Sequence, residues 1–227
     1  MEDSFKKSII LEGITGSKAY GLDTETSDED IKGIYILPTR KILSVGFNLD
    51  KTTKDHTEPD WVYHEIGKFI KLAMAGNPTI LEMLWLNEYL VLNKFGKMLV
   101  DNRHLFISEK AVRSAYSGYV FSQARKLNAR GGTYGNGRNK RYEKHTRHLF
   151  RLLIQGKQLL ESGTMDVRVT QEQREWLFNM GRLPVNEIID KFSEEIKKFD
   201  NISSVLIKNP DKEPINKLLT EIRKENW

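Results

Sequence analysis

Residues 16–38 read GSKAYGLDTETSDEDIKGIYILP, and this stretch decides the predicted fold. Its second half contains the mostly apolar run Ile31–Leu37, which predicts a buried strand that ends at a proline. A shorter apolar run at Ile9–Leu11 predicts an earlier strand, and Gly13–Ser17 is typical of the turn that follows it. The acidic residues Asp28–Asp30 therefore lie at the entrance to the second strand.

Asp28 and Asp30 are two residues apart, so on an extended strand both carboxylates point to the same face. Two like charges side by side are costly unless a cation lies between them, and carboxylate oxygens at this spacing suit Mg²⁺. Gly16 and Ser17 offer backbone N–H groups and a hydroxyl to a phosphate. Taken alone, an Asp-x-Asp pattern is also typical of a solvated loop, so the motif needs a second observation.

That second observation is the spacing of the two motifs. Ten residues separate Ser17 from Asp28, and both motifs lie between predicted strands. The arrangement resembles the nucleotidyltransferase superfamily of DNA polymerase β. More narrowly, it resembles the "predicted nucleotidyltransferase" family of bacteria and phages, which includes RNA-ligase-associated members. That family shows GS-x-x-YG, then SD-x-D-x-x-G, then a strand ending near a proline, and the resemblance covers residues 9–190.

The resemblance implies a set of catalytic, metal-binding carboxylates. Asp28 and Asp30 match the family motif, and Asp60 stands where a third carboxylate is expected. Asp50 and Asp55 lie nearby in the sequence and remain alternatives for that third position. The implied cofactor is Mg²⁺ or Mn²⁺, and the implied substrate is a nucleoside triphosphate (NTP).

Outside this stretch, strand patterns come first and helical patterns follow. We predict further strands at Asp60–Tyr63 and, more weakly, at Val45–Leu49, and helices at Glu65–Ala75, Thr79–Asn87, Ser108–Leu127, Lys144–Ser162, Gln171–Met180, Pro184–Phe199 and Pro214–Lys224. A capping box between Thr79 and Glu82 is expected to open the second of these helices. This order predicts an α+β fold. The resemblance implies that residues 1–95 form a nucleotidyltransferase catalytic core, a polymerase β-like palm with a mixed sheet and flanking helices. Residues 96–227 would then form a helical region with a basic loop.

A strongly basic segment covers residues 126–151. Within it, Lys144, His148 and Arg151 follow one another at i, i+4 and i+7, so they share one face of a helix. That face could bind a triphosphate or an RNA backbone, with Arg151 making bidentate phosphate contacts. It could also be a solvated face with a partly buried histidine. The resemblance favours the first interpretation, in which this face binds the nucleotide together with the Gly-Ser pair.

The segment just before this helix combines cations with glycines and tyrosines. Its cations include Arg130, Arg138, Lys140 and Arg141. This composition favours contact with nucleic acid, because cations bind phosphates and aromatic rings stack on bases. A surface loop without such a function has the same composition, and the residues alone do not decide between the two.

The amino-acid composition excludes several kinds of site and of protein. The chain has 227 residues with 36 Lys and Arg against 31 Asp and Glu, a net charge of +5, and no cysteine. A chain without cysteine has no disulfide, no thiolate nucleophile and no cysteine-ligated zinc. No apolar run reaches the roughly 18–20 residues of a membrane helix, and the N-terminus lacks a signal-peptide pattern. We therefore expect no membrane association and a location in the cytoplasm. The resemblance implies that this is the cytoplasm of a bacterium or of a phage-infected host.

These observations together predict a Mg²⁺-dependent nucleotidyltransferase. It would move a nucleoside monophosphate from an NTP to an acceptor hydroxyl and release pyrophosphate. The resemblance to RNA-ligase-associated members favours an RNA end, such as that of a tRNA, as the acceptor. Two alternatives stay open: an enzyme that transfers AMP to protein side chains, and a non-catalytic nucleic-acid-binding module on the same fold.

Overall fold

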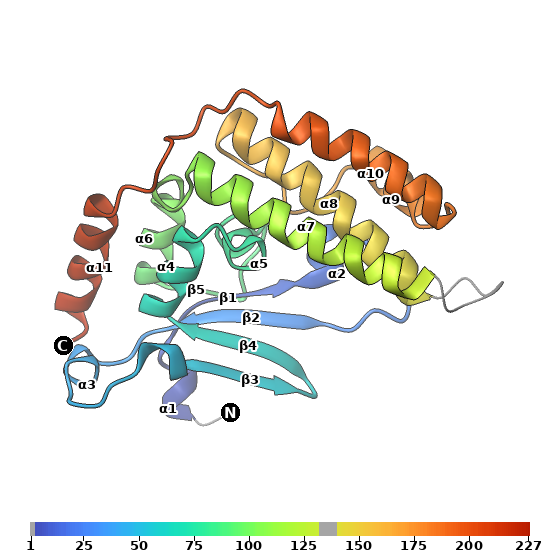
Figure 1. The fold of residues 1–227 in the computed structure, drawn as a ribbon. Coiled ribbons are helices and arrows are strands. Elements are labelled where there is room, and N and C mark those ends of the chain that lie inside the picture. Colours follow the sequence, from blue (N-terminus) through green and yellow to red (C-terminus); the bar gives the residue numbers. More distant parts are fainter. Residues whose placement is uncertain (1–2, 132–139) are drawn as a thin grey trace.

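The protein is described by a computed structural model over residues 3–131 and 140–227 (Figure 1). Within these ranges, five strands form one sheet: β1 (Ile9–Thr15), β2 (Asp30–Tyr35), β3 (Thr53–Thr57), β4 (Asp60–Glu65) and β5 (Val91–Leu92). Their order is β3-β4-β2-β1-β5. β2 and β4 run parallel, and the other neighbours run antiparallel. The sheet is therefore mixed, as predicted.

The strand register brings three distant segments to one end of the sheet. Ile31 pairs with Trp61 across the parallel pair, so Asp30 and Asp60 begin neighbouring strands at the same end. Thr15 pairs with Asp30 across the antiparallel pair, so the chain leaves β1 at that end as well. The predicted motif residues are thus gathered by backbone pairing alone.

The sheet has a different hydrophobic cluster on each face, because successive strand residues point to opposite sides. Ile34 and Ile36 enter the main core beneath the helices. Tyr35 and Tyr63 point the other way and pack with Phe5 of α1 (Asp3–Lys6) in a small second cluster. Figure 1 shows the short helix α1 below the sheet and the long helices α7 (Glu109–Gly131) and α8 (Lys140–Ser162) above it.

Helices dominate the second half of the chain, which confirms the α+β prediction. They are α2 (Gly16–Tyr20), α3 (Thr39–Ile42), α4 (Ile66–Met74), α5 (Pro78–Leu81), α6 (Lys94–Asp101), α7 (Glu109–Gly131), α8 (Lys140–Ser162), α9 (Gln171–Met180), α10 (Val185–Asp200) and α11 (Glu213–Glu225), with short 3₁₀ turns at 49–51, 82–84 and 103–106. Five leucines of α8 are buried in the core: Leu149, Leu152, Leu153, Leu159 and Leu160. The main core includes residues from β1 through α11. The predicted division into a catalytic core, residues 1–95, and a helical region, residues 96–227, stays a prediction. No helix in the described ranges is long and apolar enough to cross a membrane.

The region between β2 and β4 differs from the prediction. Val45–Leu49 is not a strand: Val45 is fully exposed, and Asn48 caps a 3₁₀ turn by accepting a hydrogen bond from the Asp50 amide. The strand lies later, at Thr53–Thr57, where it pairs with β4 at the edge of the sheet. Its sequence, TKDHT, is polar and largely exposed, so it lacks the apolar alternation from which strands are predicted.

Two local predictions around the helices were also wrong. The expected turn at Gly13–Ser17 is instead the end of β1 followed directly by α2. The expected capping box between Thr79 and Glu82 does not form, because Asn77 caps the helix by accepting from the Thr79 amide, and Pro78 takes the first helical position. The side chain of Glu82 is buried in the core instead.

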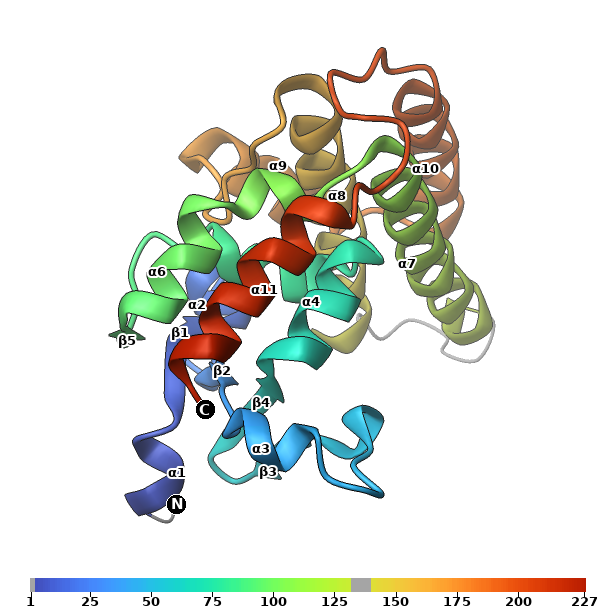
Figure 2. The same cartoon turned by 90° about the vertical axis from the view of Figure 1, so that its left-hand side faces the viewer.

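The last helix returns to the sheet and packs beside α4 and α6 (Figure 2). Arg223 forms a 2.6 Å ion pair with Glu65, whose side chain is fully buried at the end of β4. Glu65 also accepts hydrogen bonds from the amides of Gly67 and Leu37. A buried carboxylate needs such partners, since removal of the only charged one leaves an uncompensated charge in the core.

We predict that Arg223→Met lowers the free energy of unfolding by about 3 kcal/mol, because Glu65 then stays buried without a counter-charge. Urea denaturation measures this loss. Lys217→Met on the same helix is the matched control: its pair with Glu213 is exposed and worth less than about 1 kcal/mol. Equal losses in the two variants would contradict this account of α11.

Candidate functional site

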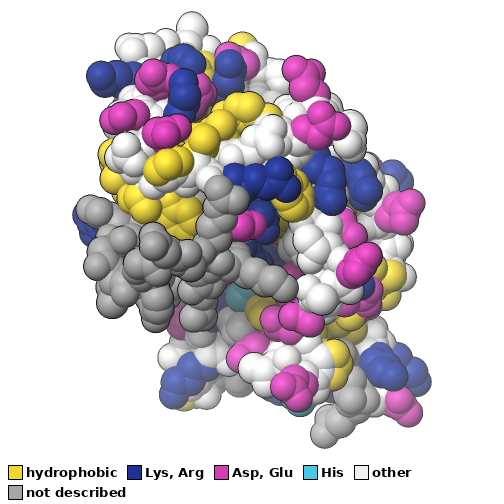
Figure 3. Space-filling view, turned by 90° about the vertical axis from the view of Figure 1, so that its right-hand side faces the viewer, with side chains coloured by type: hydrophobic (Ala, Val, Ile, Leu, Met, Phe, Trp, Pro, Cys, Tyr) yellow, Lys and Arg dark blue, Asp and Glu magenta, His cyan; other side chains and the backbone are white. Residues whose placement is uncertain are grey.

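A cavity of about 780 Å³ lies where the sheet end meets α8 and α9. One side is formed by the end of β1, the start of α2 and the starts of β2 and β4, and the opposite side by α8 with Phe178 of α9. Figure 3 shows this side of the molecule, on which acidic and basic side chains gather around a hollow. The cavity thus joins the two halves of the chain.

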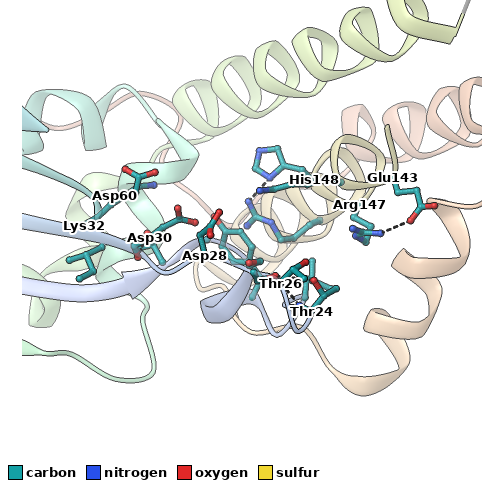
Figure 4. Close-up of a pocket in the computed structure, with 18 of the residues that line it drawn as sticks. Thr24, Thr26, Asp28, Asp30, Lys32, Asp60, Glu143, Arg147 and His148 are labelled. Carbon is teal, nitrogen blue, oxygen red and sulfur yellow. Dashed lines mark hydrogen bonds and ion pairs between the residues drawn. The ribbon is translucent and has the colours of Figure 1, made fainter. Parts of the chain in front are cut away.

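The acidic side of the cavity carries the three predicted carboxylates. Asp28, Asp30 and Asp60 all line it, and Figure 4 shows them in a row along the strand ends. Of the two alternatives for the third carboxylate, Asp50 pairs with Lys71 on the surface and Asp55 lies exposed on the edge strand β3. Neither lines the cavity.

Gly16 packs against Asp30 at the centre of this side. Its backbone has φ of +68°, which favours glycine, and a Cβ at this position would lie only 1.9 Å from the Asp30 carboxylate oxygen Oδ2. The close approach of the Gly-Ser backbone to Asp30 therefore requires glycine for two independent reasons. Gly16 and Ser17 both line the cavity.

The carboxylate of Asp30 has an unfavourable charge environment. Burial raises its pKa, and the negative charges of Asp60 and Asp28 raise it further, while Lys144 and Lys32 lower it. In the absence of a bound cation, the ionised form is thus penalised by desolvation and by repulsion.

The donor set fits a divalent cation that arrives with a phosphate. Within the described part of the chain, no group of three or more Asp, Glu or His side chains is placed to hold a metal ion by itself. Mg²⁺ normally binds through one or two carboxylates and completes its shell with water and substrate phosphates. Asp30, Asp60 and Asp28 supply hard oxygens on one wall, and the cations opposite suit the phosphates.

The basic side is formed by α8. Lys144, Arg147, His148 and Arg151 all line the cavity, so the structure brings the predicted helix face opposite the carboxylates (Figure 4). Lys144 is exposed, and its charge is close enough to lower the pKa of Asp30. Arg147, which the sequence interpretation missed, pairs with Glu143 at 3.4 Å and lies 4.4 Å from the ring centre of Phe178.

Arg151 differs from its prediction in one respect. Its side chain has no exposed surface, and its two terminal nitrogens already donate to Gln155 at 2.5 Å and to Nδ1 of His148 at 3.1 Å. The guanidinium also stacks 3.5 Å from the ring centre of Tyr20. Because the guanidinium has no exposed surface, it cannot reach a phosphate with a bidentate contact in this arrangement, although Arg151 lies at the cavity wall.

The helical half holds the loop after α2 in place. Arg174 of α9 donates to the carbonyl oxygens of Gly21 and Asp23, and the Val169 amide donates to the Tyr20 carbonyl. The loop 24–28 that follows forms one rim of the cavity. The acidic loop is therefore positioned by contacts more than 140 residues away in sequence.

Lys32 and Glu82 were also missed. Lys32 continues the period-two pattern of Asp28 and Asp30 and lines the cavity, so the alternation of the strand could have revealed it. Nothing in the local sequence marks Glu82, because its partners come from other elements. Of the predicted nucleic-acid contacts, Arg138 lies outside the described residues. The backbones of Arg130, Lys140 and Arg141 lie in α7 and α8, and their side chains are not described.

The mixed sheet with flanking helices, which places Asp30 and Asp60 at neighbouring strand ends beside the start of α2, agrees with a polymerase β-like fold. Residues 1–188 match the RNA repair pathway DNA polymerase beta family, RlaP, and the chain belongs to that family. Family membership supports nucleotidyltransferase activity in general.

The chain is also similar to a phage protein. It is 33% identical over 135 residues to an uncharacterized 38.9 kDa protein in the nrdC-mobD intergenic region of Enterobacteria phage T4. The match covers 54% of this chain and 39% of that protein, so the chain corresponds to about two fifths of the relative's length.

We predict that Asp30→Asn stabilises the metal-free protein at neutral pH. A carboxyl whose folded-state pKa is raised destabilises the fold above that pKa, and the penalty disappears as pH falls below the ordinary value of 3.8. The melting temperature of Asp30→Asn should therefore exceed that of the wild type at pH 7, and the difference should shrink toward pH 4. Asp55→Asn on the exposed edge strand should show no such gain. A lower melting temperature for Asp30→Asn at pH 7 would count against the charge environment described above.

Proposed function

We propose that the protein is a Mg²⁺-dependent nucleotidyltransferase that moves a nucleoside monophosphate from an NTP to a hydroxyl at an RNA end. One observation carries the proposal: a single cavity has the carboxylates of Asp28, Asp30 and Asp60 on the sheet side and the basic side chains of α8 on the opposite side. Clustered carboxylates suit a metal-bound phosphate, and the facing cations suit its remaining charge.

In the reaction, the acceptor hydroxyl oxygen bonds to the α-phosphorus of the NTP. The bond from that phosphorus to the oxygen of the β-phosphate breaks, and pyrophosphate leaves. The proton of the hydroxyl passes to the acidic side of the cavity. Asp28, Asp30 and Asp60 would supply the carboxylate ligands, one or two at a time, for Mg²⁺ or Mn²⁺ that arrives with the substrate phosphates. The ion would neutralise phosphate charge and lower the pKa of the acceptor hydroxyl.

Residues of the protein bind the phosphates and position the groups around them. Gly16 and Ser17 bind phosphate oxygens through a backbone that approaches closely because position 16 is glycine. Lys144 faces the carboxylates from α8 and binds the triphosphate, with His148 beside it. Arg151 contributes from behind this face, because its guanidinium is already engaged inside the protein.

An RNA acceptor such as a tRNA is supported by the family description and by the basic residues before and within α8. The positive charge reaches both the cavity and the segment that precedes it along the chain. A protein acceptor and a non-catalytic nucleic-acid-binding role are the competing outcomes of the experiments below.

Activity is tested with each α-³²P-labelled NTP, Mg²⁺ and either RNA, including total tRNA, or protein from a lysate. We expect label to appear in RNA and pyrophosphate to be released. Asp30→Asn and Asp60→Asn should reduce the rate by at least about a hundredfold, as expected when groups that stabilise developing charge are lost. They should also abolish the rise in melting temperature caused by Mg²⁺ plus NTP.

Asp55→Asn is the matched control for these two variants, since Asp55 is an exposed aspartate of the same sheet outside the cavity. It should keep both activity and the ligand-induced melting shift. Label in protein instead of RNA would establish the protein-modifying alternative. No transfer to any acceptor, with RNA binding intact, would establish the non-catalytic one.

RNA binding is tested through its salt dependence. If the basic segment contacts phosphates, neutralising Arg138, Lys140 and Arg141 together should flatten the slope of log K against log salt by about 2, since each lost contact to single-stranded RNA removes roughly 0.7. Fluorescence anisotropy with a labelled RNA measures the slope. Neutralising Lys191, Lys197 and Lys198 on the exposed side of α10 removes equal charge and should leave the slope unchanged. An unchanged slope in both triple variants would remove this segment from the RNA-binding surface.

A further inference from the structure

Glu82 lies behind the cavity wall and does not line it, yet it contacts three residues that do. Its side chain is fully buried in the 3₁₀ turn after α5. The hydroxyl of Tyr20 lies 3.0 Å from both carboxylate oxygens, Nζ of Lys32 lies 3.5 Å from Oε1, and Arg151 lies 3.6 Å from Oε2.

These three partners come from three different elements of the site. Tyr20 ends α2, which begins with the Gly-Ser pair, and Lys32 lies on β2 two residues after Asp30. Arg151 lies on α8, on the basic side of the cavity. Glu82 is therefore a common contact point for the phosphate-binding turn, the carboxylate strand and the basic helix.

Within this network, the carboxylate of Glu82 faces two cations, Lys32 and Arg151. Burial raises the pKa of Tyr20 far above its ordinary value, so the phenol stays protonated and donates to Glu82. Arg151 has no exposed surface, and Glu82 is the carboxylate paired with it. The Nε–H of Arg151 finds no hydrogen-bond partner among the described residues, which leaves one donor unused at the cavity wall.

Stability alone is a weak reason for such a network, because a buried ion pair is often no more stable than apolar residues of similar size. The chain provides a comparison. Glu65 is an equally buried carboxylate with an arginine partner, and none of its recorded contacts lines the cavity. The charged and hydroxyl partners of Glu82, in contrast, all line the cavity.

We propose that Glu82 is a positioning residue for nucleotidyl transfer, an inference that rests on the proposed function. It holds Lys32 beside Asp30 and Arg151 at the base of the α8 face, and it keeps α2 in register with both through Tyr20. Loss of the carboxylate charge then misplaces cations at the site, and a displacement of about 1 Å can cost about a hundredfold in rate.

The test compares Glu82→Gln with Glu65→Gln, which removes the same buried charge away from the cavity. Both variants are expected to lose melting temperature. Below their melting temperatures, Glu82→Gln should lose at least about tenfold in kcat/KM for the NTP and should bind magnesium pyrophosphate more weakly by calorimetry. Glu65→Gln should keep wild-type values of both. Wild-type kcat/KM in Glu82→Gln would overturn the proposal.

A double variant separates positioning from stability. Glu82→Gln combined with Arg151→Met removes both buried charges and is expected to regain the lost melting temperature. Turnover should not return, because Arg151 is then missing from the cavity wall. Recovery of turnover together with stability would mean that Glu82 serves the fold alone, and would also overturn the proposal.

Tyr20→Phe decides the case if Glu82→Gln fails to fold. It removes one hydroxyl and keeps the ring that stacks on Arg151. We expect a severalfold loss of kcat/KM with a small change in melting temperature, and an unchanged kcat/KM overturns the proposal. The activity of the wild type separates failure of the proposed function from failure of the role of Glu82. If the wild type transfers no nucleotide from any NTP to any acceptor, the proposed function is refuted. If the wild type is active and Glu82→Gln is equally active, only the positioning role of Glu82 is refuted.

Discussion

The parallel pairing of β2 with β4 is the constraint on which the site depends. It places the first residues of both strands, Asp30 and Asp60, side by side at one end of the sheet. The antiparallel pairing of β1 with β2 then delivers Gly16 to the same end. A shift of one residue in either pairing would turn these side chains to the opposite face and break the site.

This arrangement is costly for the fold. Asp30 is partly desolvated and lies near two other carboxylates, so its ionised form is disfavoured until cations approach. The protein supplies part of the compensation through Lys32 from the strand and Lys144 from α8. Under the proposed function, a metal-bound phosphate would neutralise these carboxylates and so remove the repulsion between them.

The sequence reveals those features whose physical cause is local. The Gly-Ser pair, the period-two carboxylates and the apolar run of β2 lie within 23 residues, and the structure gathers them as predicted. β3 could not be predicted because an exposed edge strand needs no apolar pattern. Glu82 could not be assigned because its environment is made by Tyr20 and Arg151, which lie 62 and 69 positions away. The three-residue spacing between Thr79 and Glu82 fits a capping box, and it therefore predicted a capping role that Glu82 does not have.

The two buried carboxylates, Glu65 and Glu82, contact different parts of the fold. β4 begins at Asp60, which lines the cavity, and ends at Glu65, which is tied to α11. These ends lie about 17 Å apart at 3.3 Å per residue, so α11 acts on the placement of the strand and not on the reacting groups. Glu82, in contrast, contacts cavity residues directly. The family match ends at residue 188, before α11 begins, whereas all four members of the Glu82 network lie inside it. The network therefore lies within the part of the chain that matches the family, whereas α11 lies beyond that part and contacts the end of β4 through Arg223.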